Sequence, residues 1–441
     1  MRIRRVSVIV PPSPYMPIDG WEGVGKAPLE GSTLAATVLS RAGYDVTGYD
    51  LRGMQNAEDR ILGEVAKDDL ICLAGTADGY AFVKRFAAAI KKRNPSKPVL
   101  LGGCLSSVSW KTVLARTEVD LCLLGECETA LPAFVRLLEA EAPPNGLPIA
   151  FKAGGRIHGP AVGFITPGSA DIPTPDMGVW AHAGEVRFPE VACYSTQRGC
   201  RESCSFCANP WKGMWRPLPA LKIRDDLREL KARGTREVWF NDPTFNTEES
   251  HCWQVVQIMR ELELTWTCSI RAVPASTEMF RAMRDAGCRS LFLGIESADD
   301  AVLAVNHKAI RLADTVRCLA AATDAGIPIV GFLLLGLPGE TTESLARTIE
   351  FTRTHSFTPR PRFAMPYPGT SLFHAFAGEN RYRLGSPEDI EERILESMSS
   401  VSCEGPEPPY EMPGSRVSLG DLRQAMAEIL KCDSVHCRHG E

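Results

Sequence analysis

The sequence has no long hydrophobic run and no run of basic residues. A membrane-spanning helix needs roughly 18 consecutive apolar residues, and the apolar stretch 331–339 is far shorter. The net charge is −5, so the charge pattern gives no support for binding to nucleic acid. These absences predict a protein with neither a membrane nor a nucleic-acid partner.

A secretion signal and a disulfide scaffold are also missing. The first residues are basic but run into Pro11 and Pro12 without a small-residue cleavage site, which favours a first strand over a signal peptide. The 15 cysteines are scattered over 441 residues, unlike those of small secreted domains. We therefore expect a cytoplasmic protein with mostly structural thiols and a few that hold a metal.

What the sequence does contain is typical of a large α/β protein. Hydrophobic residues make up 44% of the chain and charged residues 23%, and the length suggests two or three domains of roughly 150 residues. Over residues 1–145, near-continuous apolar strands alternate with helices, which predicts a parallel, doubly wound, Rossmann-like sheet. The expected strands are 6–12, 45–50, 69–75, 97–103 and 120–126.

A second alternation of strands and helices follows a stretch rich in proline and glycine. We expect residues 146–190 to form a linker and residues 191–375 to form six β/α units, an incomplete version of a barrel that normally has eight. The C-terminal segment, 376–441, is expected to add one helix over 419–431. The expected barrel strands are 191–196, 236–242, 264–271, 290–297, 327–336 and 361–368.

Three cysteines lie within eight residues, directly after the first of these barrel strands. A disulfide between two of Cys200, Cys204 and Cys207 would leave one thiol over, and a structural zinc site normally has four ligands in two pairs. Cys193 could supply a fourth ligand, but it lies inside an expected strand. A four-iron cluster held by only three thiolates would keep one iron open for another ligand. Structural zinc and inert thiols are the alternatives.

Polar and charged residues recur where the other barrel strands end. Active sites of such folds lie at the carboxyl ends of the strands, so these residues are candidates for a single site. Ordinary ion pairing is the alternative for Arg271 and Glu296. The candidates are Asn241, Asp242, Arg271, Glu296, Ser297, Gly336, Glu340 and 366–368.

The cysteine loop resembles the signature of radical S-adenosylmethionine (SAM) enzymes, in which an aromatic residue, here Phe206, precedes the last of three cysteines. The N-terminal half is similar to the cobalamin-binding domain that precedes the barrel in one subgroup, the class B methyltransferases. The resemblance implies a partial β6/α6 barrel with the cysteine loop after its first strand. It covers residues 5–375 and includes the stretches 31–50, 97–103, 120–129, 241–246, 266–271, 283–297, 331–341 and 366–373.

The same resemblance implies the cofactors. The three cysteines would ligate a 4Fe–4S cluster whose open iron binds SAM, and reductive cleavage of SAM would give a 5′-deoxyadenosyl radical. In the methyltransferase branch, methylcobalamin then methylates an unactivated carbon of a small molecule or peptide. No catalytic residue is expected beyond the cofactor ligands. The residues implied to bind SAM are Phe206, Asp242, Arg271, Glu296, Ser297, Gly336, Leu337 and Met365.

Cobalamin is expected at the carboxyl ends of the N-terminal strands. The sequence departs from the family here, because the motif Asp-x-His-x-x-Gly is absent and residues 1–150 contain no histidine. Cys104 and Leu105 stand where the family more often has Pro-His, so a domain that no longer binds cobalamin is an alternative. The residues implied to bind cobalamin are Thr76, Asp78, Gly102, Gly103, Ser106, Gly125 and Glu126.

Two other functions compete with methylation. One is a radical reaction without methyl transfer, namely cyclisation, rearrangement, oxidation or epimerisation. The other is a non-catalytic sensor that binds cobalamin or a metal. By analogy with the family, an enzyme of this kind takes its electron from a flavodoxin- or ferredoxin-type donor.

The remaining cysteines are expected to be structural. Four of them lie on expected helix or strand faces and are predicted to pack as small hydrophobic residues, namely Cys252, Cys268, Cys288 and Cys318. Cys403, Cys432 and Cys437 are irregularly spaced near the C-terminus, and we do not expect them to bind a second cluster.

Overall fold

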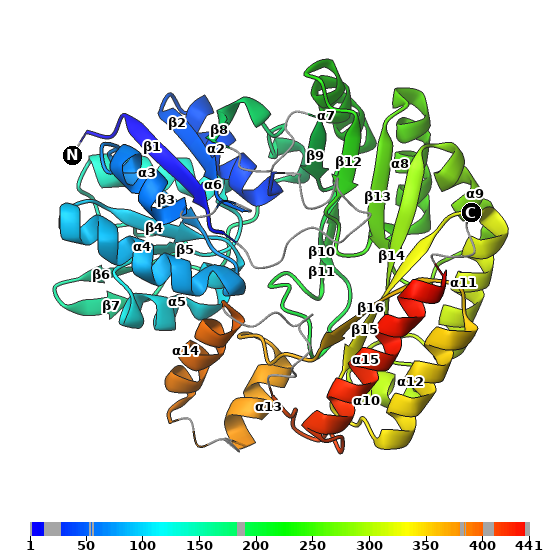
Figure 1. Cartoon of the computed structure of the whole chain (residues 1–441). Coiled ribbons are helices and arrows are strands. Elements are labelled where there is room, and N and C mark those ends of the chain that lie inside the picture. The colour runs from blue at the N-terminus through cyan, green and yellow to red at the C-terminus, as the bar shows by residue number, and fades with distance from the viewer. Residues whose placement is uncertain are drawn as a thin grey trace. The chain divides into compact units, whose positions relative to one another are not determined.

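The computed structural model describes residues 2–12, 28–52, 54, 57–182, 190–379, 383, 385–399 and 410–436. The chain divides into two compact units. The first contains the residues up to Cys193, the short stretch Arg233–Thr235 and the segment around helix α14 (Pro387–Met398), and the second contains the rest (Figure 1). None of the helices described is both long and apolar enough to cross a membrane.

The first unit is built on an eight-stranded sheet with the order β7-β6-β5-β4-β3-β1-β2-β8. The pairs β5–β6 and β6–β7 are antiparallel and the others are parallel. Because β1 lies between β2 and β3, the strand order switches at β1 and β3, where ligands bind in such sheets. The strands are β1 (Arg5–Val10), β2 (Asp45–Asp50), β3 (Leu70–Ala74), β4 (Val99–Gly102), β5 (Leu121–Leu123), β6 (Ile149–Ala153), β7 (Arg156–His158) and β8 (Trp180–His182).

Helices bury apolar side chains on both faces of this sheet. Leu39 of α2 and Phe134 of α6 belong to one buried cluster, and Phe86 of α4 and Leu105 of α5 belong to another. Two separate clusters are what a doubly wound sheet requires, since both faces of its strands are apolar. The helices are α2 (Glu30–Arg41), α3 (Ala57–Val65), α4 (Tyr80–Arg93), α5 (Cys104–Arg116) and α6 (Cys127–Glu139), with short 3₁₀ turns η1 (Ala77–Gly79), η2 (Ser169–Asp171) and η3 (Met177–Val179).

The second unit is built on a six-stranded sheet with the order β16-β15-β14-β13-β12-β9, and the division between the units falls within β9, after Cys193. Consecutive strands lie next to one another, and the pairs from β12 to β16 are parallel. Their carboxyl ends therefore meet at one edge. The strands are β9 (Val191–Tyr194), β12 (Glu237–Phe240), β13 (Thr265–Ile270), β14 (Cys288–Glu296), β15 (Ile329–Leu335) and β16 (Thr358–Phe363), and a separate antiparallel hairpin joins β10 (Gln197–Cys200) to β11 (Met214–Pro217).

Helices follow the strands of the second unit as the β/α pattern predicts. The last helix, α15 (Leu419–His436), packs against α12, β15 and β16. The others are α7 (Ala220–Ala232), α8 (Glu249–Leu262), α9 (Thr277–Asp285), α10 (Asp300–Val305), α11 (Leu312–Ala325), α12 (Thr342–Thr354) and α13 (Ser371–Glu379), with a 3₁₀ turn η4 (Phe245–Thr247).

The predicted fold class is confirmed: a doubly wound parallel sheet precedes an incomplete β6/α6 barrel. Two expectations about the connecting segments differ from the structure. The expected linker 146–190 contributes β6, β7 and β8 to the first sheet, and the C-terminal segment 376–441 contains the end of α13 and the whole of α14 besides the expected helix. The short edge strands lack the apolar run that marks the central ones, so the sequence pattern does not predict them.

Candidate functional site

The three cysteines of the 200–207 stretch lie on the loop of the β10–β11 hairpin. Cys200 ends β10 and pairs with Met214, which begins β11. Gly199 has φ 80°, and a Cβ there would collide with the carbonyl oxygen of Met214, so only glycine allows the strands to pair this closely. The hairpin therefore presents the cysteines on a closed loop, immediately after the first barrel strand.

Hydrogen bonds within the loop fix its shape. The backbone N–H of Cys207 donates to the carbonyl of Cys204 (3.2 Å), and the N–H of Gly213 donates to the carbonyl of Glu202 (3.2 Å). The Lys212 ammonium donates to the carbonyl of Cys207 (3.1 Å). These bonds hold the backbone around the thiols without engaging the sulfur atoms.

Asn306 anchors the loop to a neighbouring turn. Its side-chain oxygen accepts from the Ser205 hydroxyl (2.8 Å), and its carbonyl accepts from the Ser205 N–H (3.1 Å). Its amide nitrogen donates to the carbonyl of Pro338 (2.9 Å). Asn306 is completely buried, so it connects the cysteine loop firmly to the turn that follows β15.

The thiols have the donor chemistry that an iron–sulfur cluster needs. Burial raises the pKa of the Cys204 thiol to about 11, an effect that Lys308 opposes and the other two thiols increase. Burial also raises the pKa of Cys207. Buried thiols of this kind become thiolates when metal ions compensate their charge. No group of three Cys, His, Asp or Glu side chains among the described residues could hold a single metal ion. A four-iron cluster does not require such a group, because each of its thiolate ligands binds a different iron.

Glu296 has a backbone conformation that is unusual for its residue type. Its φ is 65°, in the left-handed region that favours glycine, and the register between β14 and β15 shifts between Gly294 and Glu296. A Cβ on Gly294 would lie 2.6 Å from the Glu296 carboxylate. Such conformations at strand ends are typical of functional sites.

The Glu296 carboxylate forms an ion pair with Lys308 at 2.8 Å, and both side chains are about nine-tenths buried. Lys308 also lowers the pKa of Cys204, whereas Glu296 raises it. The structure thus brings a buried carboxylate and a buried ammonium group next to the cysteine loop. The sequence pattern does not point to Lys308, because this residue follows the short helix α10 and not a strand.

Arg271 and Asp242 are both engaged with the chain near the cysteine loop. The Arg271 guanidinium pairs with Glu202 and donates to the carbonyl of Ala309 at 2.9 Å. Asp242 accepts hydrogen bonds from the backbone and hydroxyl of Thr196. Arg271 and Glu296 thus both form ion pairs within the protein, as the alternative to a role in SAM binding predicts. SAM binding by Asp242, Arg271 and Glu296 stays a prediction.

The turn after β15 is shaped by Glu340. Its carboxylate accepts from the N–H of Gly336, whose φ is 89°. Leu337 is completely buried and Met365 nearly so, whereas Phe206 on the cysteine loop is half-buried. Ser297 Oγ and Glu340 Oε1 are buried and have no hydrogen-bond partner among the described residues, so two polar atoms at these strand ends can still accept a ligand's hydrogen bonds.

The buried carboxyl group of Glu340 leads us to expect that the stability of the fold depends on pH. Burial raises its pKa from 4.5 to about 7, so the folded state binds this proton more tightly than the unfolded state does. The resulting stabilisation is full below the unfolded pKa and is lost as the pH rises through about 7. We expect the free energy of unfolding in urea to fall between about pH 5 and about pH 8 more steeply for the wild type than for Glu340→Gln. Equal slopes would contradict this assignment.

In the first unit, the loops after β3 and β4 bind each other through their backbones. The N–H of Gly75 donates to the carbonyl of Gly102 (2.8 Å), and the N–H of Leu105 donates to the carbonyl of Gly75 (3.0 Å). A Cβ on Gly103 would lie 2.8 Å from the carbonyl oxygen of Gly75, whereas a Cβ on Gly102 would meet nothing within 4 Å. Gly102 therefore leaves open space at this edge of the sheet.

The other predicted cobalamin residues occupy the same edge. Thr76 is exposed and precedes η1, which contains Asp78. The Ser106 hydroxyl is buried and bonds the carbonyl of Leu123 (2.6 Å), which ties α5 to β5. A Cβ on Gly125 would lie 3.0 Å from the ring of Phe164. The open space at Gly102 would allow a ligand to approach the backbone there, and the role of these loops in cobalamin binding stays a prediction.

Glu126 and the remaining cysteines are largely buried. Glu126 lies at the start of α6 with 5% of its surface exposed. Cys252, Cys268, Cys288 and Cys318 are all buried, and burial raises the pKa of Cys318 to about 12. Cys432 is buried on α15 and forms no disulfide, whereas Cys403 and Cys437 lie outside the described residues.

Comparison with known protein families identifies the second unit. Residues 194–352 match the model of the radical SAM superfamily, and this range holds the cysteine hairpin, Asp242, Glu296 and the turn after β15. The chain has a radical SAM domain. The expected 4Fe–4S cluster and SAM are the cofactors of such a domain, and the radical SAM domain makes the chain an enzyme.

Longer similarities extend beyond this domain. A Pyrococcus horikoshii protein named as an uncharacterized methyltransferase is 26% identical, over 86% of this chain and 84% of its own. An anaerobic magnesium-protoporphyrin IX monomethyl ester cyclase of Rubrivivax gelatinosus is 26% identical, over 80% of this chain and 67% of its own. This chain has the same fold as the solved structure of the radical SAM methyltransferase TsrM from Kitasatospora setae, which contains bound cobalamin and a 4Fe–4S cluster. The TM-score is 0.73 and the sequence identity is 16%, and the match covers 98% of this chain and 89% of TsrM.

Proposed function

We propose that this radical SAM enzyme is a cobalamin-dependent methyltransferase that methylates an unactivated carbon of a small molecule or peptide. The observation that carries the proposal is the presence of both units on one chain: a three-cysteine hairpin beside the buried pair of Glu296 and Lys308, and an N-terminal sheet whose glycine loops leave an open edge at Gly102. The relative named as a methyltransferase and the TsrM fold support it.

The residues of the second unit would bind SAM through complementary charge. The Glu296 carboxylate would accept hydrogen bonds from the ammonium group of SAM, and the Lys308 ammonium would donate to the carboxylate of SAM. Both side chains are about nine-tenths buried, and their charged atoms lie 2.8 Å apart. Ser297 Oγ is free to bond a hydroxyl of the ligand. The adenine would lie near Gly336, Leu337 and Met365, which directly follow the ends of β15 and β16.

When bound, a 4Fe–4S cluster would supply one electron for the cleavage of SAM, and cobalamin would supply the methyl group. The chain holds Cys200, Cys204 and Cys207 as ligands and keeps the loop closed through Asn306 and Arg271. Residues 1–150 contain no histidine, so none of the loops proposed to bind cobalamin could supply a histidine ligand. The residues that would line the cobalamin site are Thr76, Asp78, Gly102, Gly103, Ser106, Gly125 and Glu126.

The electron donor and the compartment follow from this chemistry. A reduced cluster needs a strong one-electron reductant, and we propose a flavodoxin- or ferredoxin-type protein. We also propose a cytoplasmic location, because the 15 cysteines are scattered along the sequence and do not form the pattern of a secreted disulfide scaffold.

Anaerobic turnover tests the proposal without knowledge of the substrate. The protein is reconstituted with iron, sulfide and hydroxocobalamin, reduced, and given SAM. We expect both 5′-deoxyadenosine and S-adenosylhomocysteine, because one SAM is cleaved to the radical and a second gives its methyl group to cobalamin. Omitting cobalamin should remove S-adenosylhomocysteine alone.

A second function has one observation in its favour. The relative from Rubrivivax gelatinosus is named as a cyclase, not a methyltransferase. For a radical reaction without methyl transfer, 5′-deoxyadenosine would form and S-adenosylhomocysteine would not, with or without cobalamin. That result would overturn the proposed methylation and leave the radical SAM assignment intact.

A further inference from the structure

Helix α14 lies far along the chain but belongs to the N-terminal unit. Its side chains Ile390, Ile394, Leu395 and Met398 are at most 1% exposed. Leu395 belongs to the same buried cluster as Tyr80 of α4 and Leu105 of α5. In Figure 1, α14 (orange) lies beside α5 (cyan). The helix is therefore an integral part of the core of this unit.

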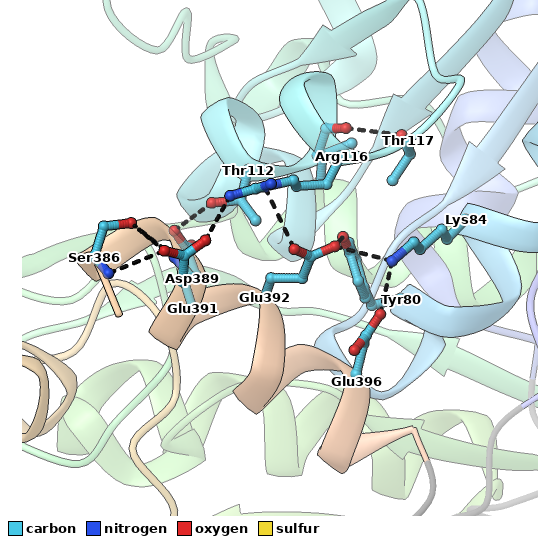
Figure 2. A network of polar contacts seen from close by, with 11 residues as sticks. Tyr80, Lys84, Thr112, Arg116, Thr117, Ser386, Asp389, Glu391, Glu392 and Glu396 are labelled. Carbon is cyan, nitrogen blue, oxygen red and sulfur yellow. Dashed lines mark hydrogen bonds and ion pairs between the residues drawn. The ribbon is translucent and has the colours of Figure 1, made fainter. Parts of the chain in front are cut away.

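A polar network surrounds the apolar contact, with Glu392 at its centre (Figure 2). The Glu392 carboxylate accepts from the Lys84 ammonium at 2.9 Å and from the Tyr80 hydroxyl at 3.3 Å, and it lies 3.3 Å from Nε of Arg116. Only 17% of its side chain is exposed. One carboxylate thus joins α4 and α5 to α14.

Further contacts extend the network along the helix. Near its start, Asp389 accepts from Arg116 (2.6 Å) and Glu391 accepts from Thr112 (2.6 Å). Near its end, the N–H of Ala81 donates to the Ser399 hydroxyl (3.1 Å). Contacts to α4 or α5 therefore run along the whole length of α14.

The two helices that α14 holds begin at the loops proposed to bind cobalamin. Helix α4 starts at Tyr80, directly after η1 with Asp78, and α14 also packs against η1. Helix α5 starts at Cys104, directly after Gly102 and Gly103. The chain before and after α14 belongs to the other unit, so α14 packs beside these loops although its neighbours in the sequence belong to the radical SAM unit.

We infer that α14 is a positioning element of the cobalamin site: its docking through Glu392 orders the loops after β3 and β4, so docking of α14 and binding of cobalamin strengthen each other. This rests on the proposed function. Linkage requires reciprocity. A ligand that binds only the ordered loops must stabilise the docked helix. A change that undocks the helix must in turn lower the affinity for the ligand by the same factor.

Hydrogen exchange on the wild-type, full-length protein tests one direction of this coupling. On addition of hydroxocobalamin, we expect slower exchange both in the loops 76–80 and 102–106 and in residues 387–398. The change in α14 should be about fivefold or more, the lower end of typical couplings. Protection of the two loops without protection of α14 would overturn the inference and leave the proposed function standing.

A charge reversal tests the other direction. Glu392→Lys places a cation opposite Lys84 and Arg116, and we expect cobalamin affinity, followed by its visible spectrum, to fall about tenfold. The matched control is Glu388→Lys, which makes the same change at an exposed position of the first turn of α14 and should change affinity less than about twofold. Lys84 also pairs with Glu396 at 2.7 Å, so Lys84→Glu/Glu392→Lys/Glu396→Lys restores both ion pairs with opposite signs and should recover part of the loss, which a general loss of folding would not allow.

The failures are distinguishable. If Glu392→Lys binds cobalamin as the wild type does, although exchange in α14 is faster, docking and binding are independent and the inference is wrong. If the wild type itself neither binds cobalamin nor shows protection of the two loops, the cobalamin part of the proposed function fails, and the inference with it.

Discussion

Replacing Cys204 with alanine is expected to abolish SAM cleavage and to remove the cluster's broad visible absorption near 400 nm. Cys204 is the most buried of the three loop thiols, and the pKa of its thiol is about 11, so it becomes a thiolate only with a metal beside it. Loss of one of three protein ligands leaves two irons without a thiolate. We expect 5′-deoxyadenosine formation to fall by at least about a thousandfold, about 4 kcal/mol, in an anaerobic assay with SAM and reductant.

The control is Cys318→Ala on α11. Cys318 is even more deeply buried than Cys204, with 1% exposed against 8%, but it lies away from the strand ends on a helix. Its replacement should cost some stability and leave iron content, absorption and SAM cleavage near wild-type values. Equal behaviour of the two variants would show that Cys204 acts as a packing residue and that the cluster assignment is wrong.

Replacing Asp242 with alanine is expected to destabilise the second unit strongly. The carboxylate is 1% exposed and accepts from the N–H groups of Thr196 and Gln197 at 2.8 and 3.0 Å and from the Thr196 hydroxyl at 2.7 Å. Each buried donor left without an acceptor costs about 1–3 kcal/mol, so we expect a loss of at least about 3 kcal/mol in the free energy of unfolding. Because Gln197 begins β10, iron loading should fall as well.

Asp242→Asn separates geometry from charge. Its amide oxygen can still accept from both N–H groups, and its amide nitrogen can donate to the Thr196 hydroxyl. This hydroxyl also lies 3.1 Å from Nε2 of His251, whose pKa burial lowers. We expect the asparagine variant to lose about 1 kcal/mol and to keep its iron. If urea unfolding shows the alanine variant to be no less stable than the asparagine variant, the structural role of Asp242 is wrong.

The amino-acid sequence is sufficient to predict the central strands of both sheets and the edge at which the site lies. Central parallel strands are continuous apolar runs, and stretches such as 69–75 and 327–336 are recognisable for that reason. Because parallel strands end at one edge of their sheet, the order of the motifs along the chain already places Glu296 and the cysteine loop together. The family resemblance then supplies the cofactors.

Lys308 and Asn306 cannot be predicted in the same way. They follow α10, a helix of six residues, and no periodic pattern shows that this connection lies against the cysteine loop. Their positions depend on tertiary packing, since Asn306 bonds Ser205, 101 residues earlier in the chain. The ion pair of Lys308 with Glu296 likewise becomes visible only once the chain is folded.

Helix α14 is a different case, because a local signal is present. Ser386 and Asp389 form a capping box, and Pro387 stands at the first helical turn, a combination that marks a helix start. What no local pattern reveals is the partner of this helix, since Glu392 bonds Tyr80 across 312 residues. Helix existence is a local property, whereas docking depends on the whole fold.

Electron paramagnetic resonance of the reconstituted, dithionite-reduced protein, recorded with and without SAM, examines the cysteine loop itself. If Cys200, Cys204 and Cys207 are the ligands, as proposed, one iron of the cluster would stay open for SAM. We predict the signal of a reduced 4Fe–4S cluster, and a change in its shape when SAM is added. A cluster signal that SAM leaves unchanged, or no cluster signal at all, would contradict the assignment of this loop as the ligand set of a SAM-binding cluster.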